Sequence, residues 1–426
     1  METSQPNRRS ILAAAAALVA SGSACGQALQ SARPAPVRAA DFLATIGVNT
    51  HLGYPQTQYG DVSAVLEALQ FTGVKHVRDA APSAKAPDAW RSYEALAAAG
   101  VGACLFWGAK RPMAEAIADL SALEALHPGA VDALEGPNEI KPNFAYAGRT
   151  GNAAAQAFMA DMRSAARRDP WLERKPLVIF TTYARAAADC DFANQHPYPK
   201  AGAQPASLLQ LVRDRNVGPD GVMPGKPMVF TELGYHTLVG KPTRPAAWQG
   251  VDPERQAILL VNALLDGAAL GISRTYIYQL LDCYPDRGPP DQEKHFGLYR
   301  FDGSAKPAAK ALRNLFARLS DDGPGARAFA TNSFPARVAA PPLVSSLALQ
   351  DSAGRNFLIL WNEAPVWSAE LAAPLESEPV STRLVLERPG PLRAFDIIDS
   401  TGDRVFAPAS SFAISLGAHP ILLQIG

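Results

Sequence analysis

The sequence predicts an α/β protein in which a (β/α)8 TIM barrel is followed by a small all-β sandwich domain. Between residues 44 and 320, short apolar runs alternate with Ala- and Leu-rich stretches of helical spacing, a pattern typical of a parallel sheet. There are eight such runs, which favours a closed barrel over the alternative of a doubly wound open sheet. The length of 426 residues also suits a barrel of about 250 residues with a smaller second domain.

The predicted barrel elements follow one another in chain order. Strands are expected within 44–52, 74–80, 102–108, 131–139, 177–183, 191–198, 227–235 and 275–282. Helices are expected over 62–72, 90–99, 114–126, 153–168, 206–214, 253–270 and 308–319, and only a short turn fits between the fifth and sixth strands. Continuous apolar runs suit strands buried on both faces. Asp61 and Asp252 precede two of the helices as starter residues.

Both ends of the chain differ from this barrel, which we place at residues 40–322. Residues 326–426 contain alternating strands with turn signals and no helical period, which predicts the sandwich. Trp361 and Trp367 are its candidates for an exposed row of glycan-binding aromatics. We nevertheless expect this domain to buttress the barrel rather than to bind glycan.

Residues 1–32 resemble a secretory leader. Arg8-Arg9 precede an apolar, Ala-rich run from Ile11 to Ala20, which suggests twin-arginine export and a periplasmic or secreted protein. A buried N-terminal helix is disfavoured because the run is short and uncapped. Cys25 follows small residues in a loose likeness to a lipoprotein cleavage site, so a lipid anchor there is an open alternative.

Composition narrows the possible partners. Lys+Arg 40 balances Asp+Glu 40, so no basic surface for nucleic acid is indicated. Beyond the leader, no apolar run is long enough to span a bilayer. Cys104, Cys190 and Cys283 are odd in number and widely spaced, which predicts buried thiols and leaves one disulfide open. We expect a monomer that needs no cofactor and no metal.

Polar and aromatic residues gather at the C-terminal ends of the predicted strands, where the chemistry of a TIM barrel lies. Charged groups there are costly unless they are paired or used. One such residue alone could simply face water in a loop, but seven strand ends at one mouth indicate a site. These ends carry Asn49, Thr50 and His51; Arg78 and Asp79; Trp107; Asn138 and Glu139; His196 and Tyr198; Thr231 and Glu232; and Tyr278, Gln279 and Asp282.

Glu139 and Glu232 are the two carboxylates that carry the functional prediction. They end the fourth and seventh predicted strands, which lie across the mouth from each other in a closed eight-stranded barrel. Glycoside hydrolysis uses two carboxylates that flank the scissile bond, about 5–5.5 Å apart for retention and further apart for inversion. The sequence therefore predicts a glycoside hydrolase.

Asn-Glu, His-x-Tyr and Thr-Glu, in this order on strands four, six and seven, resemble the clan A glycoside hydrolases of the family 39-like or family 5-like kind. Those are (β/α)8 retaining enzymes that act on β-linked sugars, and several of their families carry a similar C-terminal β-sandwich. The resemblance covers about residues 44–320. It implies that Glu139 is the acid/base and Glu232 is the nucleophile of a β-glycosidase with a carbohydrate substrate.

The resemblance also implies roles for neighbouring residues. Asn138 would hydrogen-bond the sugar 2-hydroxyl, and His196 would line the same subsite. Tyr198 would sit beside Glu232 and help to hold it. Arg78 resembles the strand-two arginine that pairs with the nucleophile, a pairing that makes physical sense because a nearby guanidinium favours the ionised carboxylate.

The aromatic platforms for the sugar depart from the pattern of the clan in this sequence. Many members of the clan carry a tryptophan on strand eight, where this chain offers Tyr278 or Gln279. Trp107 is a second candidate for stacking on sugar C–H surfaces, with core packing as its equal alternative. His51 ends the first strand and is expected to line the same mouth.

The loop after the eighth strand is acidic, but it lacks the Asp-x-Asp-x-Asp-Gly spacing of a calcium loop. We therefore expect a substrate-binding lid there. Its acidic residues are Asp282, Asp286, Asp291 and Glu293. The predicted function is a secreted retaining hydrolase of β-linked oligo- or polysaccharides. The alternatives are an inactive carbohydrate-binding protein on the same barrel and a transglycosylase that uses the same residues.

Overall fold

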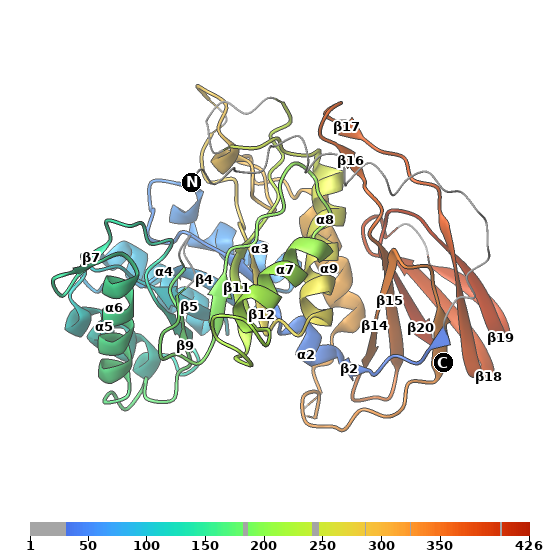
Figure 1. Cartoon of the computed structure of the whole chain (residues 1–426), viewed down its shortest axis with the longest axis horizontal. Helices are drawn as coiled ribbons and strands as arrows, with labels where there is room; N and C mark the ends of the chain where they lie inside the picture. Colours follow the sequence, from blue (N-terminus) through green and yellow to red (C-terminus); the bar gives the residue numbers. More distant parts are fainter. Residues whose placement is uncertain (1–30, 182–185, 241–246, 286, 324, 401–402) are drawn as a thin grey trace, which may run out of the picture.

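The computed structural model describes residues 31–181, 186–240, 247–285, 287–323, 325–400 and 403–426. The predicted leader and Cys25 lie outside the described residues. A parallel barrel occupies one half of the molecule and a curved, mainly antiparallel sheet the other (Figure 1).

Eight parallel strands form the barrel, in the order β10-β11-β12-β3-β4-β5-β6-β9. A parallel bridge between Val178 and Phe192 brings the two ends of this order together, so the barrel is nearly closed and the open-sheet alternative is wrong. The strands are β3 (Ile46–Asn49), β4 (His76–Ala80), β5 (Gly102–Phe106), β6 (Val131–Glu135), β9 (Leu177–Val178), β10 (Ala193–Gln195), β11 (Met228–Leu233) and β12 (Arg274–Ile277). The first seven in chain order lie within predicted runs, and β12 begins one residue before the eighth run.

Helices surround the barrel. Seven of them follow the predicted order with ends that shift by a few residues, and the short helix Ala39–Leu43, before the first barrel strand, was not predicted. The helices are α2 (Ala39–Leu43), α3 (Val62–Thr72), α4 (Pro87–Ala98), α5 (Met113–Leu126), α6 (Gly151–Ala166), α7 (Ala206–Val217), α8 (Pro253–Ala269) and α9 (Pro307–Leu319), with 3-10 turns η1 (Gln58–Gly60) and η2 (Gln292–Lys294). Asp61 caps α3 by accepting from the Ser63 and Ala64 amides, and Asp252 caps α8. These side chains satisfy amides that the first helical turn leaves without partners.

The C-terminal part is all-β, as predicted. Its strands are β13 (Ala336–Ala339), β14 (Val344–Gln350), β15 (Asn356–Asn362), β16 (Trp367–Ser368), β17 (Ala373–Pro374), β18 (Val380–Asp396), β19 (Arg404–Leu416) and β20 (Ile421–Ile425). The long β18 pairs with β13 through its first half and with β20 through its second half, and its pairing with β19 shifts register around Gly390. The two halves are therefore parts of one hydrogen-bonded sheet that share a core containing Leu358, Leu384 and Phe412.

The segment before the barrel joins this same sheet. Strand β1 (Ser31–Ala32) pairs with β13, and β2 (Val37–Arg38) pairs with β14. No structure was predicted for this segment, because strands of two residues show no hydrophobic periodicity in the sequence. The sheet thus contains residues from both ends of the described chain. A separate short hairpin, β7 (Ala145–Tyr146) and β8 (Arg149–Thr150), lies in the loop before α6.

The β domain packs against helices α8 and α9, which lie between it and the barrel strands (Figure 1). Alternate residues of β14 and β15, such as Leu349, Phe357 and Ile359, belong to the same apolar cluster as the barrel core. Trp361 and Trp367 are both buried, so neither offers an exposed face to a glycan. No helix in the described part of the chain has the length and apolar character to cross a membrane.

Two carboxyl groups meet at this interface, Asp266 of α8 and Glu363 beyond β15. Both accept from the Trp361 indole N–H, at 2.9 Å and 2.8 Å. Burial, and then the neighbouring Glu363 carboxyl, raises the pKa of Asp266 to about 8. Burial also raises the pKa of Glu363. At neutral pH the native interface therefore holds a proton. The unfolded chain, in which an aspartate has a pKa of about 3.9, has already released that proton.

This pair predicts a pH-dependent stability that Asp266→Asn should remove. A pKa that is higher in the folded state gives stability that is present below the unfolded pKa and lost as pH rises through about 8. Relative to wild type, the Tm of Asp266→Asn should rise by on the order of 2 °C between pH 5 and pH 9, measured by circular dichroism. Asp322→Asn, at an exposed aspartate, is the control. Parallel curves for wild type and Asp266→Asn would show that the interface holds no such proton.

Candidate active site

A cavity of about 960 Å³ opens at the C-terminal ends of the barrel strands, where a TIM barrel carries its chemistry. This volume is at the upper end of the range of about 300–1,000 Å³ that is usual for small-molecule sites. The lining residues are His51, Gly53, Tyr54, Arg78, Asp79, Ala80, Phe106, Asn138, Glu139, His196, Tyr198, Lys200, Glu232, Ala247, Trp248, Tyr278, Gln292, Glu293 and Phe296.

Arg78, on β4, organises the floor of this cavity. It is 2% exposed and forms a bidentate pair with Glu135, at 2.9 Å from Nε and 2.8 Å from Nη2. Its Nη1 donates to Glu232 Oε1 at 2.5 Å, and its Nη2 donates to Asn138 Oδ1 at 2.7 Å. A planar guanidinium suits such multiple pairing. One side chain therefore fixes groups from β6 and β11.

Glu232 lies within β11 and is held by three neighbours. Besides Arg78, Tyr198 donates its hydroxyl to Glu232 Oε2 at 2.7 Å, and His196 Nδ1 lies 3.5 Å from the same oxygen. Burial alone would raise the pKa of Glu232, but His196, Arg78 and the Tyr198 hydrogen bond outweigh it and hold the pKa below its ordinary value. The Glu232 carboxylate is therefore ionised at neutral pH.

Glu139 follows β6 in a strained backbone conformation. Its φ is +41°, a left-handed region that costs a residue with a side chain about 1–2 kcal/mol. Its amide donates to Thr181 Oγ1 at 2.8 Å, which holds the turn. Gly136 precedes it where the chain passes close to β9, since a Cβ there would lie 2.7 Å from the Phe180 amide nitrogen. The backbone conformation after β6 thus directs the Glu139 side chain to the cavity.

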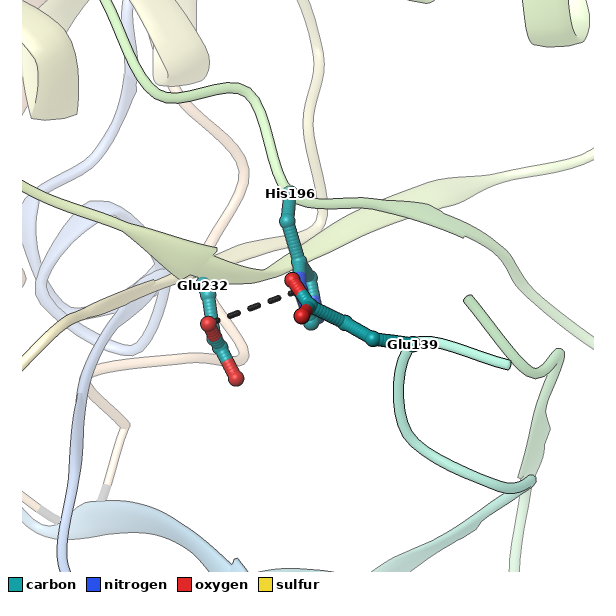
Figure 2. Close-up of side chains that lie close together, drawn as sticks. All are labelled: Glu139, His196 and Glu232. Atoms are coloured by element: carbon teal, nitrogen blue, oxygen red, sulfur yellow. Dashed lines mark hydrogen bonds and ion pairs between the residues drawn. The ribbon is translucent and has the colours of Figure 1, made fainter. Parts of the chain in front are cut away.

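The two glutamates face each other across His196 (Figure 2). An oxygen of Glu139 and an oxygen of Glu232 lie within 4.8 Å of each other. His196 Nδ1 is 3.0 Å from Glu139 Oε1, and its Nε2 is 3.0 Å from Thr231 Oγ1. The side chain of Glu139 is 43% exposed, against 10% for Glu232. The two carboxylates therefore experience different environments at short range.

The structure brings together all but one of the site residues named from the sequence. Those that line the cavity are His51, Arg78, Asn138, Glu139, His196, Tyr198, Glu232 and Tyr278. Trp107 is the exception. It is 4% exposed and packs edge-on against Phe158 of α6, so core packing describes it and the platform prediction is wrong. Successive side chains of an extended chain point to opposite faces, and here Phe106 takes the inward position.

Sequence reasoning missed several residues that support this site. Glu135 is fully buried, and besides Arg78 it accepts from Asn194 and Thr231, at 3.2 Å and 3.0 Å. The signal that could have found it is a glutamate at the last position of an apolar run. Lys200 and Trp248 also line the cavity; both lie in loops that carry no periodic pattern.

One group of residues in the described chain is close enough to hold a metal ion: Glu139, His196 and Glu232. The Arg78 guanidinium already neutralises Glu232, and its positive charge opposes a cation there. In the acidic loop, Asp282 pairs with Lys306 at 2.8 Å, and Asp286 lies outside the described residues. The donor set therefore fits acid–base chemistry better than metal binding. Cys104, Cys190 and Cys283 are free and buried.

Solved structures share this fold. A monomeric β-xylosidase from Caulobacter crescentus CB15 matches with a TM-score of 0.56 and 15% identity, covering 93% of this chain and 97% of that one. A GH39 β-xylosidase from Caulobacter crescentus matches with a TM-score of 0.54 and 15% identity, covering 93% and 98%. The resemblance to glycosidases with a barrel and a β domain is thus confirmed at the level of the fold.

The remaining comparisons with known proteins give a weaker structural match or no match. A GH2 β-galacturonidase from Eisenbergiella tayi matches with a TM-score of 0.46 and 16% identity over 64% of this chain, and the chain spans about half (51%) of that protein. No protein-family model matches the sequence, and no curated protein matches it.

The Arg78–Glu135 pair predicts a large stability effect. Glu135→Leu leaves the buried guanidinium with unpaired donors, so the free energy of unfolding should fall by about 3–5 kcal/mol. Guanidinium chloride unfolding measures it. Glu67→Leu, at an exposed glutamate on α3, should stay within about 0.5 kcal/mol of wild type. Equal losses in the two variants would mean that Glu135 does not support Arg78.

Proposed function

We propose that this protein is an exported glycoside hydrolase that cleaves β-linked oligo- or polysaccharides by a retaining double displacement. The observation that carries the proposal is the facing pair Glu139 and Glu232, with carboxylate oxygens within 4.8 Å of each other. That approach agrees with the separation of about 5–5.5 Å used for retention and leaves little room for the water of an inverting mechanism. Export is proposed from the Arg8-Arg9 leader pattern, and a monomeric state remains part of the proposal.

Glu232 is the nucleophile in this proposal. Its contacts with Arg78 and Tyr198 keep it ionised, and the same contacts hold its position before substrate binds. Attack on the anomeric carbon forms a bond to a Glu232 oxygen as the bond to the leaving oxygen breaks. Ordered neighbours lower the cost of reaching this geometry.

Glu139 is the acid/base. It gives a proton to the leaving oxygen in the first step and removes one from water in the second. Having given its proton to the leaving oxygen, Glu139 is a carboxylate when water enters, and it takes the proton that the water releases as it attacks the anomeric carbon. The greater exposure of Glu139 suits a group that meets both a leaving sugar and an incoming water.

Asn138 and Tyr278 complete the binding of the reacting sugar. Asn138 Oδ1 accepts from Arg78, so its amide N–H groups are left for a sugar hydroxyl beside the reacting carbon. Tyr278 lines the cavity and packs against Tyr198 with ring centroids 6.2 Å apart. Asn138 thus provides a polar contact to the sugar, and the ring of Tyr278 provides an apolar wall beside it.

The test compares wild type with Glu232→Ala and Glu139→Ala on nitrophenyl β-glycosides and β-linked polysaccharides. Glu139→Ala should lower kcat by about 10²–10⁴-fold, and Glu232→Ala should be inactive until azide is added. An α-glycosyl azide product would identify Glu232 as the nucleophile. Glu67→Ala, at the exposed α3 glutamate, is the control.

Other results would replace the proposal. A chain that cleaves nothing on the panel but binds a glycan with both glutamates intact is a carbohydrate-binding protein. Longer oligosaccharides formed at high acceptor concentration would indicate a transglycosylase.

A further inference from the structure

Tyr54 differs from the other aromatic residues that line the cavity. It is 48% exposed, whereas Phe296 is buried and the remaining aromatic side chains are half-buried: Phe106, Tyr198, Trp248 and Tyr278. Single exposed aromatic side chains are common on protein surfaces, so it is the place of Tyr54 in the lining of the cavity that is informative. Tyr54 is therefore a candidate contact for a ligand.

Two other aromatic rings of the cavity already have a cation on one face. The Arg78 guanidinium lies 4.1 Å from the centroid of Phe106, and the Lys200 ammonium lies 5.1 Å from the centroid of Trp248. Such cation–π contacts occupy the surface that a sugar would use. Tyr54 has no cation over its ring among the described contacts.

His51 supports the Tyr54 ring from one side. The two rings stack with centroids 5.5 Å apart and an interplanar angle of 14°. His51 is itself fixed edge-on by Tyr59 and Tyr278, at 5.4 Å and 5.6 Å. Burial lowers the pKa of His51 to about 4, so its ring is neutral near pH 7. Because one face of Tyr54 lies on His51, its exposed area is the opposite face and the edge.

The loop that carries these rings is anchored to the barrel. Asp79 Oδ2 accepts from the Thr50 hydroxyl at 2.7 Å and from the Leu52 amide at 2.8 Å. Within the loop, the Tyr54 carbonyl accepts from the Thr57 amide and hydroxyl. The Tyr54 face is thus preorganised, which reduces the entropy lost on binding.

The barrel order places Tyr54 away from the proposed acid/base. Tyr54 follows β3, and β4 and β5 separate that strand from β6, which carries Glu139. The leaving sugar departs on the Glu139 side in the proposed mechanism. A sugar linked to the other end of the reacting residue would therefore extend toward β3. From Tyr198 beside the nucleophile, the rings of Tyr278, His51 and Tyr54 follow in contact.

We propose that Tyr54, backed by His51, forms a second sugar subsite on the side opposite the leaving group. The sugar's C–H face stacks on the open face of Tyr54, so the favoured substrate presents two β-linked sugars, rather than one terminal sugar, ahead of the scissile bond. This inference rests on the proposed glycosidase function and assigns the length of its glycone.

Matched pairs of chromogenic substrates test the subsite in the full-length protein. The pairs are nitrophenyl β-xyloside with β-xylobioside and nitrophenyl β-glucoside with β-cellobioside. Wild type should favour a bioside in kcat/KM. Tyr54→Ala should lower the bioside-to-monoside ratio about tenfold, which corresponds to about 1.4 kcal/mol. Tyr54→Phe should keep the ratio, because the ring face remains. Trp171→Ala is the control, at a tryptophan equally exposed at 48% but outside the cavity.

The outcomes separate this inference from the proposed function. An active enzyme whose substrate ratio is the same in Tyr54→Ala as in wild type overturns the subsite and leaves the glycosidase intact. If no glycoside is cleaved, the binding of xylotetraose and cellotetraose, measured by calorimetry, tests the subsite independently of catalysis. Binding that Tyr54→Ala weakens and Trp171→Ala does not supports the subsite. Equal binding in all variants, or no binding, overturns it.

Discussion

The buried guanidinium of Arg78 is the constraint on which this site depends. A charge placed at the bottom of the cavity is costly unless its partners compensate for the lost water. Arg78 meets Glu135 with two hydrogen bonds and Glu232 with a third. The partners come from β6 and β11, on different sides of β4 in the barrel order. The ion pairs therefore set the relative positions of three strands at the end where the cavity opens.

The same arrangement gives the two facing glutamates different properties. Glu232 lies among an arginine, a histidine and a tyrosine hydroxyl, which together hold its pKa low despite burial. Glu139 stands on a left-handed turn, with nearly half of its side chain exposed. Separate environments for two carboxyl groups are the usual way for one site to supply an acid and a nucleophile. The asymmetry follows from the partners on each strand rather than from the residue type.

The β domain supports this site from a distance. The residues that line the cavity lie between positions 51 and 296, so the sheet contributes none of them. Its Trp367 packs against Gly202, where a Cβ would meet the indole at 2.6 Å, and Gln204 donates to the Ala364 carbonyl at 2.7 Å. These contacts fix the loop after β10 that carries Tyr198 and Lys200. Buttressing thus extends from the interface helices to the rim of the cavity.

The sequence by itself determined the eight strands, the seven main helices and the pair Glu139 and Glu232, because hydrophobic periodicity and strand ends are local features of the chain. It also indicated Arg78, Asn138, His196 and Tyr198, since each lies within the last three residues of a predicted strand. Only the tertiary structure decided that Phe106 rather than Trp107 faces the cavity, that Glu135 is the second partner of Arg78, and that residues 31–38 join a sheet formed mainly by residues after 335. These outcomes depend on side-chain direction and on contacts between segments far apart in the chain, which no local pattern records.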